Sequence, residues 1–398
     1  MQPAPSPQDS PAPSVGAAEL PVAAHSVAPA RVLRGPGAWA EALPLIGTLG
    51  GHGLLLGRSP ATAALRHQLA SGLASRGVRV TPAELAWDCC AEDLQRLEAE
   101  ARSAGVDLVL AAGGGKVLDA GKLLARRLHL ACVTVPTSAA TCAGWTALAN
   151  LYSPQGAFLG DVALERCPDL LVFDHQLVRQ APRRTLASGI ADAMAKWYEA
   201  SVSSGGSQDG MVQQAVQMAR VLRDQLLLEG EAAMADAAEQ LPSAAWVRVA
   251  EACGLTAGLI GGLGGARCRT VAAHAVHNGL TQLAACHGSL HGEKVGFGVL
   301  VQLRLEELVG GQQLAAQARR QLLPLFERLG IPCSLAQLGL GQASLSELEA
   351  VCAWACAPQS DLHRLPFPVG EADLLAALVS TTSAAGTACP QASERQPV

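Results

Sequence analysis

Short apolar runs alternate with amphipathic stretches through the first half of the chain. The apolar runs have the length of buried strands, and the stretches between them have helical periodicity. The predicted strands are His52–Gly57, Gly77–Val80, Val106–Ala111 and Leu130–Val135, and the predicted helices are Ala61–Ser75, Ala91–Ala104 and Lys116–Leu128. Strands that alternate with helices in this way predict a parallel sheet with helices on both faces.

The pattern changes after the fourth strand. Leu148–Tyr152 and Ala157–Val162 flank the turn signal Ser153–Gly156 and predict a hairpin appended to the sheet. Leu170–Phe173 predicts a last strand that ends at Asp174. Beyond Pro182, Ala- and Leu-rich stretches with polar residues at helical spacing predict an all-α domain.

These changes predict four segments. They are a disordered Pro/Ala/Ser-rich leader (residues 1–30), a dinucleotide-binding α/β domain (31–182), a helical metal-binding domain (183–388) and a disordered tail (389–398). The length of 398 residues suits two domains.

Composition narrows the class of protein. The chain is 49% hydrophobic with a net charge of −5, so we expect a large core and no nucleic-acid partner. Its 12 cysteines form no disulfide framework or metal-binding pair, which is typical of reduced thiols in a cytoplasmic protein. We expect no membrane-spanning run and no secretory signal.

A glycine-rich turn follows the third predicted strand and opens the next helix. Such a turn lets a phosphate approach the backbone N–H groups of a helix N-terminus, although a tight turn without a ligand gives the same pattern. Thr137 ends the neighbouring strand at the same edge of the sheet. The residues of this predicted nucleotide site are Gly113, Gly114, Gly115, Lys116, Asp119 and Thr137.

Four residues of the helical domain have side chains that bind catalytic metals. Asp192 lies in an apolar helical stretch, His274 and His277 are one helical turn apart, and His291 opens a helix. Each alone is explained by capping or by a satisfied core position. Together, an oxygen ligand and imidazoles predict a divalent metal with one position open for substrate.

The motifs resemble those of the glycerol dehydrogenase branch of the iron-containing alcohol dehydrogenase superfamily, over residues 31 to 385. The matching segments are Gly113–Asp119, Val135–Thr137, Gly189–Ala193, Ala273–Gly279 and His291–Gly298. This resemblance implies an α/β dinucleotide-binding domain followed by a helical domain, with the site between them. It also implies a homo-oligomer that acts on a small-molecule substrate.

The resemblance assigns roles to individual residues. Asp192, His274 and His291 become the metal ligands, and His277 becomes a neighbouring residue that relays a proton. The cofactor-binding set also takes in residues after the fourth strand and in the hairpin, namely Ala140, Thr146, Leu148 and Tyr152.

Three departures from the branch bear on substrate and cofactor. Cys142 replaces the Asp that helps glycerol dehydrogenases bind a polyol, and the surrounding Thr-Cys-Ala-x-Trp-Thr is similar to the hydroxycarboxylate dehydrogenase A group, which reduces 2-oxo acids with NADPH. Arg58 stands where NAD-using relatives have an acidic residue, so we expect NADP(H) over NAD(H). Lys196 replaces a metal-binding His of iron-dependent members, so we expect zinc over iron.

The sequence hypothesis is a metal-dependent NAD(P)(H) oxidoreductase of a small 2-oxo or 2-hydroxy acid, with Lys196 and Cys142 at the substrate. Alternatives are a glycerol or other polyol dehydrogenase, a dehydroquinate-synthase-like lyase, and a nucleotide-binding protein that has lost catalysis. Both assigned cations also have a structural alternative. Arg58 is then a solvated surface residue, and Lys196 then reaches solvent or pairs with Glu199 or Glu293.

Overall fold

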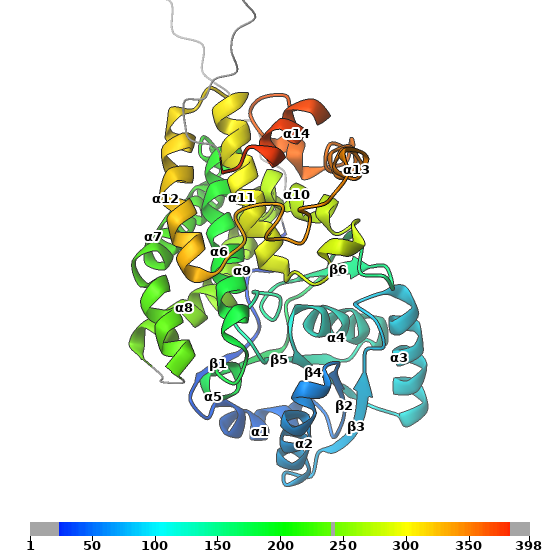
Figure 1. The fold of residues 1–398 in the computed structure, drawn as a ribbon. Coiled ribbons are helices and arrows are strands. Elements are labelled where there is room, and N and C mark those ends of the chain that lie inside the picture. The colour runs from blue at the N-terminus through cyan, green and yellow to red at the C-terminus, as the bar shows by residue number, and fades with distance from the viewer. Residues whose placement is uncertain (1–23, 240–242, 383–398) are drawn as a thin grey trace, which may run out of the picture.

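A computed structural model describes residues 24–239 and 243–382 (Figure 1). The predicted leader and tail therefore lie largely outside the described residues. The first half of the chain forms a six-stranded sheet with the order β1-β8-β5-β4-β2-β3, in which every pairing is parallel. The strands are β1 (Val32–Gly35), β2 (His52–Gly57), β3 (Arg79–Glu84), β4 (Leu108–Gly113), β5 (Ala131–Pro136) and β8 (Leu170–Asp174).

Helices cover both faces of this sheet, as predicted. In β2, Leu55 packs in a core with the helices of one face, whereas Leu54 and Leu56 pack in a core with those of the other. A strand of continuous apolar residues is thus buried on both sides. The first face carries α1 (Ala38–Leu49) and α2 (Ala63–Ala74), and the second carries α3 (Ala91–Ala104) and α4 (Gly115–Leu128).

The second predicted strand and the predicted hairpin differ from the prediction in position or pairing. β3 begins two residues and ends four residues beyond the predicted strand. Pro82 and Glu84 are unusual within a strand, but β3 lies at the edge of the sheet, where such residues are tolerated. The predicted hairpin forms as β6 (Leu148–Tyr152) and β7 (Phe158–Ala163), but it makes its own two-stranded sheet. Through Ala149 and Tyr152 it packs into the core shared with α3 and α4.

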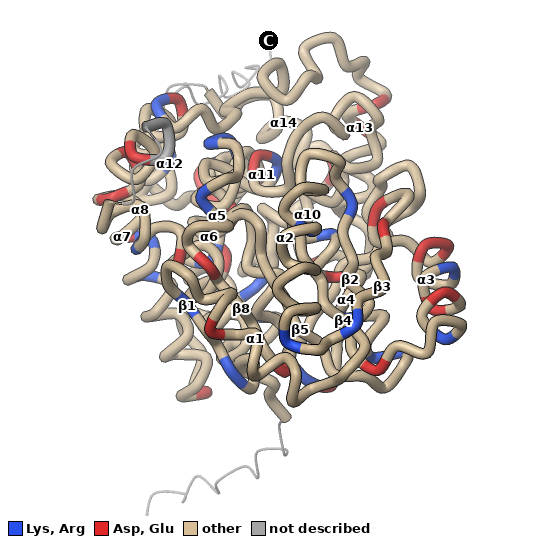
Figure 2. Tube along the Cα trace, turned by 90° about the horizontal axis from the view of Figure 1, so that it is seen from below, with Lys and Arg blue, Asp and Glu red and all other residues tan. Residues whose placement is uncertain are grey.

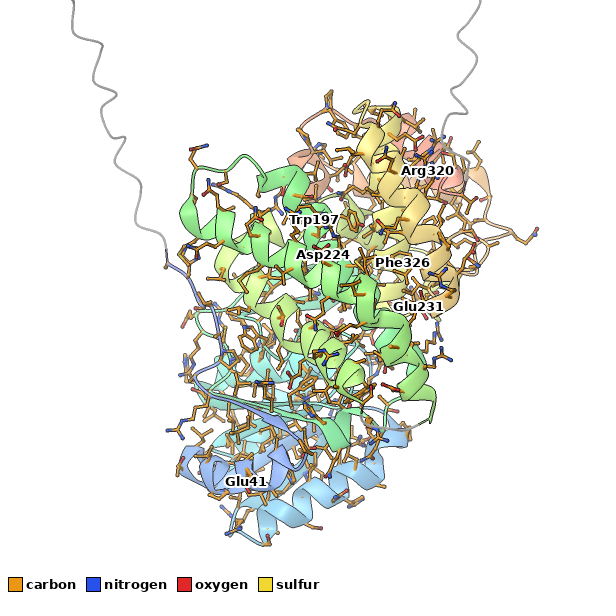
Figure 3. The ribbon with its side chains drawn as sticks, turned by 90° about the vertical axis from the view of Figure 1, so that its left-hand side faces the viewer. Glu41, Trp197, Asp224, Glu231, Arg320 and Phe326 are labelled. Carbon is orange, nitrogen blue, oxygen red and sulfur yellow. The ribbon has the colours of Figure 1, made fainter. Side chains whose placement is uncertain are left out.

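The second half is helical in every described element after β8. The helices are α5 (His175–Val178), α6 (Arg183–Ser204), α7 (Gly210–Glu239), α8 (Ala244–Glu251), α9 (Ala257–Gly264), α10 (Ala272–Leu280), α11 (His291–Leu308), α12 (Gln313–Leu329), α13 (Leu345–Ala355) and α14 (Glu371–Val379). Figure 3 marks α6, α7 and α12 by Trp197, Asp224 and Phe326. Helix α6 packs against both α7 and α11, so its residues lie at the centre of this half.

One helical stretch, Ala244–Cys268, is long and apolar enough to cross a membrane by length and composition. The expectation that no run reaches that length is therefore wrong for this stretch. It comprises α8, a π-helical turn (Ala252–Thr256), α9 and a 3-10 turn (Gly265–Cys268), and 61% of its most apolar window is buried inside the protein. Because it packs against α6 and α7, its apolar residues belong to the helical core.

Charged side chains of both signs lie interspersed on the outer helices. Along α3, basic and acidic positions alternate (Figure 2), and Arg96 pairs with Glu100 one turn away. Arg102 pairs with Glu98 in the same way. Such i,i+4 pairs are typical of a solvated helix face.

Candidate active site

Two adjoining cavities lie between the halves of the protein. The larger, of about 910 Å³, is lined by the glycine turn, Arg58, Thr137 and His277. The smaller, of about 270 Å³, is lined by Asp192, Lys196, His274 and Cys142, and His291 borders both. The larger has the size of a cofactor site, and the smaller is just below the range of about 300–1,000 Å³ that is typical of ligand pockets.

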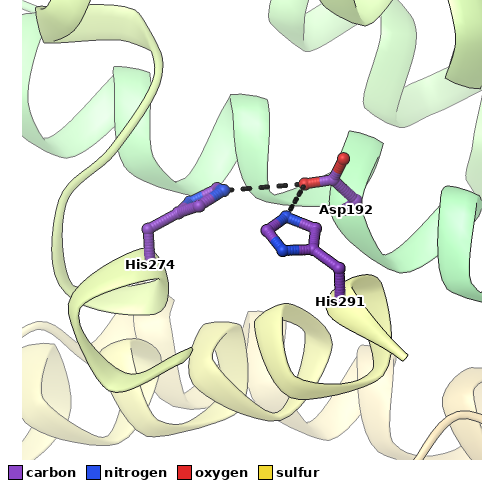
Figure 4. Close-up of side chains that lie close together, drawn as sticks. All are labelled: Asp192, His274 and His291. Atoms are coloured by element: carbon purple, nitrogen blue, oxygen red, sulfur yellow. Dashed lines mark ion pairs between the residues drawn. The ribbon is translucent and has the colours of Figure 1, made fainter. Parts of the chain in front are cut away.

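Asp192, His274 and His291 converge from three helices, α6, α10 and α11 (Figure 4). Asp192 Oδ1 lies 3.6 Å from His274 Nε2 and 3.4 Å from His291 Nε2. Two ligands of one tetrahedral zinc ion, bonded at about 2.0–2.1 Å, are about 3.3–3.4 Å apart. The three atoms therefore have the spacing of a metal ligand set.

A close helix contact sets this spacing. The hydroxyl of Ser188 on α6 accepts a hydrogen bond from the backbone N–H of Gly292 on α11 at 3.1 Å. A Cβ atom on Gly292 would lie only 1.8 Å from the Ser188 carbonyl oxygen. Only glycine lets the two backbones approach this closely, and the contact places His291 beside Asp192.

Buried Glu199, one turn after Lys196 on α6, orients His274. Its carboxylate lies 2.6 Å from His274 Nδ1 and also accepts the backbone N–H groups of Val271 and His274. The Nδ1–H of His274 donates to Glu199, so Nε2 is the ring nitrogen that faces Asp192 and that a metal would bind, with release of its proton. Sequence reasoning missed this role, and its only signal was the helical spacing of Asp192, Lys196 and Glu199.

His277 orients His291 in the same way. The amide oxygen of Asn278 accepts from His277 Nδ1 at 2.8 Å, so His277 Nε2 is the acceptor for His291 Nδ1 at 2.9 Å. Burial, together with His291 and Lys294, holds the pKa of His277 well below its ordinary value, which keeps the ring neutral. This arrangement leaves the Nε2 lone pair of His291 facing Asp192.

The Nε2 atoms of two imidazoles thus face one carboxylate oxygen. Asp192 Oδ1 is buried and has no hydrogen-bond partner in the described part of the chain. Burial acts to raise its pKa, but His291, His274 and Lys196 outweigh burial and hold that pKa well below its ordinary value. Burial acts to lower the pKa of His274, but Glu199 and Asp192 raise it to about 9. The donor set therefore attracts a cation, and a divalent metal fits it.

Lys196 is buried on the wall of the smaller cavity. Its ammonium donates to the carbonyl of Arg269 at 3.4 Å, whereas Glu199 is engaged by His274, and Glu293 pairs with Arg184. The two carboxylates named as possible partners of Lys196 are thus occupied elsewhere. Cys142 lines the same cavity, and burial raises the pKa of its thiol to about 11, so it is neutral.

The glycine turn opens α4 as predicted, with Gly114 as the N-cap residue. The ammonium of Lys116 lies 4.7 Å above the Tyr152 ring and pairs with Asp88, which also pairs with Arg58. Asp88 follows β3, and sequence reasoning did not single it out. Arg58 is thus an ion-pair partner and not a free cation.

The other predicted cofactor residues divide between the two cavities. Ala140 and Tyr152 line the larger, whereas Thr146 and Leu148 line only the smaller. Asp119 borders both, where it accepts the N–H of Asn150 at 3.1 Å and pairs with Lys122 at 3.0 Å. Buried Lys122 also donates to the carbonyls of Ala143, Thr146 and Leu148, so it anchors the loop before β6.

Comparison with known proteins gives the family. The family model "Iron-containing alcohol dehydrogenase" matches residues 29–175. An uncharacterised oxidoreductase of Synechocystis sp. is 51% identical over 370 residues, which span 93% of this chain and 94% of the relative. The chain belongs to the iron-containing alcohol dehydrogenase family.

Two further relatives place the chain within that family. Hydroxycarboxylate dehydrogenase A of Escherichia coli is 36% identical over 74% of this chain and 80% of its own length. The crystal structure of a probable glycerol dehydrogenase from Sinorhizobium meliloti superposes with a TM-score of 0.77 at 27% identity, covering 90% of this chain and 97% of the other. Within the iron-containing alcohol dehydrogenases, the chain therefore lies in the glycerol dehydrogenase branch and is an oxidoreductase.

Proposed function

We propose that this iron-containing alcohol dehydrogenase relative is a metal-dependent NAD(P)(H) enzyme that interconverts small 2-oxo and 2-hydroxy acids. The observation that carries the proposal is the buried ammonium of Lys196 in the cavity of the Asp192–His274–His291 set. A cation there favours an anionic substrate, and the neutral thiol of Cys142 adds no repelling charge.

The residues of the two cavities bind different groups. The glycine turn and the N-terminus of α4 hold the cofactor phosphates in the larger cavity. Asp192, His274 and His291 hold a divalent metal, and zinc is favoured over iron because Lys196 replaces a fourth protein ligand. When bound, the metal supplies Lewis-acid polarisation of the reacting carbonyl. Lys196 holds the substrate carboxylate, and neutral His277, between His291 and Asn278, relays a proton.

A polyol dehydrogenase is the second candidate, because the Sinorhizobium meliloti structure is that of a probable glycerol dehydrogenase. The same metal set would serve a polyol. Cys142 and Lys196 favour the acid, since neither offers the carboxylate that would accept hydrogen bonds from polyol hydroxyls. A nucleotide-binding protein without catalysis is disfavoured, because the complete, oriented donor set is retained. The eleven cysteines in the described residues are all free thiols, which suits the proposed cytoplasmic location. A homo-oligomer is part of the same proposal.

Lys196→Met tests directly whether Lys196 binds the carboxylate of a 2-oxo acid substrate. We expect kcat/KM for 2-oxo acids to fall, with a loss of transition-state stabilisation of about 1.5–3 kcal/mol, the usual scale for a hydrogen bond to a charged group. An uncharged ketone of the same length should lose much less, and the metal content should not change. Steady-state kinetics with both substrates make the comparison. Equal losses for the charged and the neutral substrate would show that Lys196 supports the cavity without binding a carboxylate.

Arg58→Asp tests the proposed preference for NADPH. Arg58 and Lys116 share the single carboxylate of Asp88, so this cluster keeps an excess positive charge that suits a 2′-phosphate. We expect the wild type to prefer NADPH and the variant to shift toward NADH. The ratio of kcat/KM for the two cofactors measures the shift. A tenfold preference of the wild type for NADH, about 1.4 kcal/mol, contradicts this assignment.

A further inference from the structure

The smaller cavity contains a second cation, Arg269, that neither the metal set nor the proposed chemistry uses. Arg269 lies in the short link between the 3-10 turn Gly265–Cys268 and α10, and its side chain lines the cavity that Lys196 also lines. Its backbone carbonyl accepts the Lys196 ammonium at 3.4 Å. The two cations therefore belong to one wall of the same small space.

The stem of Arg269 is held against α9. A Cβ atom built on Gly261 would lie 3.1 Å from Arg269 Cγ and 3.2 Å from Cδ, so the aliphatic part of the side chain runs directly over this glycine. A side chain packed along its stem keeps its charged end in a narrow range of positions. The guanidinium, with five N–H donors, makes no hydrogen bond or ion pair with any residue in the described ranges 24–239 and 243–382.

Two carboxylates, those of Asp161 and Asp361, attract Arg269 electrostatically. Asp361 is already engaged, because it accepts from the Thr270 hydroxyl and pairs with Arg364 at 2.8 Å. Asp161 on β7 is exposed and attracts Arg269 electrostatically without a hydrogen bond between them. Burial lowers the pKa of Arg269, which shows that the guanidinium has lost part of its hydration.

A partly desolvated guanidinium beside a buried ammonium favours an anionic ligand, and its planar fork matches a carboxylate in particular. We propose that Arg269 binds a second carboxylate of the substrate, so that the preferred substrates are 2-oxo dicarboxylic acids. The proposal rests on the proposed function, in which Lys196 holds the carboxylate next to the reacting carbonyl. Arg269 would then select for the group at the other end of the molecule.

The test compares acids of equal length with one and with two carboxylates. NADPH oxidation is measured with four-, five- and six-carbon 2-oxo acids, such as 2-oxopentanoate against 2-oxopentanedioate. The wild type should have the higher kcat/KM for the diacid at its best length. Arg269→Met should lower that value about 10- to 150-fold, mainly through KM, and should change the monoacid less than about threefold. Arg269→Lys, which keeps the charge, should recover part of the loss.

Asp161→Asn is the matched control. If Arg269 only fastens the hairpin through Asp161, removal of either charge gives the same loss for both acids, and the proposal is overturned. The proposal predicts instead that Asp161→Asn leaves diacid turnover unchanged or improves it, because a competing carboxylate is gone. Binding gives a readout without turnover, since pentanedioate should raise the Tm of the wild type more than pentanoate does, and this difference should vanish in Arg269→Met.

Failure of this inference is distinguishable from failure of the proposed function. If monoacids are good substrates, diacids are no better, and Arg269→Met affects both alike, Arg269 has no part in specificity and the 2-oxo acid proposal stands. If no 2-oxo acid is reduced while a neutral hydroxyketone is, the proposed function is wrong, and the role of Arg269 is wrong with it.

Discussion

Replacing His274 by alanine should remove metal binding and activity together. His274 supplies one of three converging donors, and the two that remain, Asp192 and His291, cannot close a tetrahedral site. Even the loss of a residue that only orients a ligand typically costs about 10- to 100-fold in metal affinity, so loss of the ligand itself should cost on the order of 100-fold or more. Metal analysis of the purified variant and turnover on the same sample measure both effects.

His67→Ala is the control for this variant. His67 is exposed on α2, in the α/β half and not among the three candidate ligands, and its alanine variant should keep the wild-type metal content and activity. The variant at His274 should keep its secondary structure, since Glu199 still holds the backbone N–H groups of Val271 and residue 274. A His274→Ala protein with full metal content would show that the ligands lie elsewhere.

The second large effect is expected at Gly189, in the turn of α6 that precedes Asp192. A Cβ atom there would lie 1.9 Å from the carbonyl oxygen of Ala139 and 3.2 Å from the Cβ of Cys253. The carbonyl oxygen of Ala139 is a backbone atom, so it cannot rotate away as a side chain can. Helix α6 must therefore move away from the loop that follows β5. Gly189→Ala should therefore lower the free energy of unfolding by about 3 kcal/mol, the upper end of the usual cost of overpacking. Because that loop also borders the smaller cavity, activity should fall as well.

Thermal or urea unfolding of Gly189→Ala measures the loss of stability. Gly206→Ala provides the comparison, because a Cβ atom at Gly206 would have no neighbour within 4 Å. That variant should stay within about 0.5 kcal/mol of the wild type, as surface substitutions usually do. If the two alanine variants unfold alike, the contact between α6 and the loop at Ala139 is not as close as the structure has it.

The sequence predicted the elements whose signal is local and strong. The four predicted strands of the sheet correspond to β2, β3, β4 and β5, with the bounds of β2 as predicted and the others displaced by a few residues. Helix α3 has the predicted bounds Ala91–Ala104. The sequence did not predict β1 and α1. The first is four residues long and only partly buried, and Pro44 inside α1 argues against a helix interior. Tertiary packing against β8 decides both elements.

Within the candidate site, motif reasoning found the residues that carry a recognisable pattern. It named Asp192, His274 and His291, which the fold brings within ligand spacing, although their binding of a metal stays a prediction. It could not find the roles of Glu199 and Arg269, since neither stands in a matching motif and each acquires its role only when α6 and the link before α10 come together. Nor could it foresee that Asp88, distant in sequence, pairs with Arg58.

The central claim is a metal-dependent reduction of 2-oxo acids by a nicotinamide cofactor. The most direct measurement is NADPH and NADH oxidation over a panel of 2-oxo acids, with glycerol oxidation in the reverse direction, before chelation, after chelation and after metal is restored. We expect turnover of 2-oxo acids that chelation abolishes and zinc restores, and we expect glycerol to be the poorer substrate. Full activity in the metal-free protein, or glycerol as the better substrate, would contradict it.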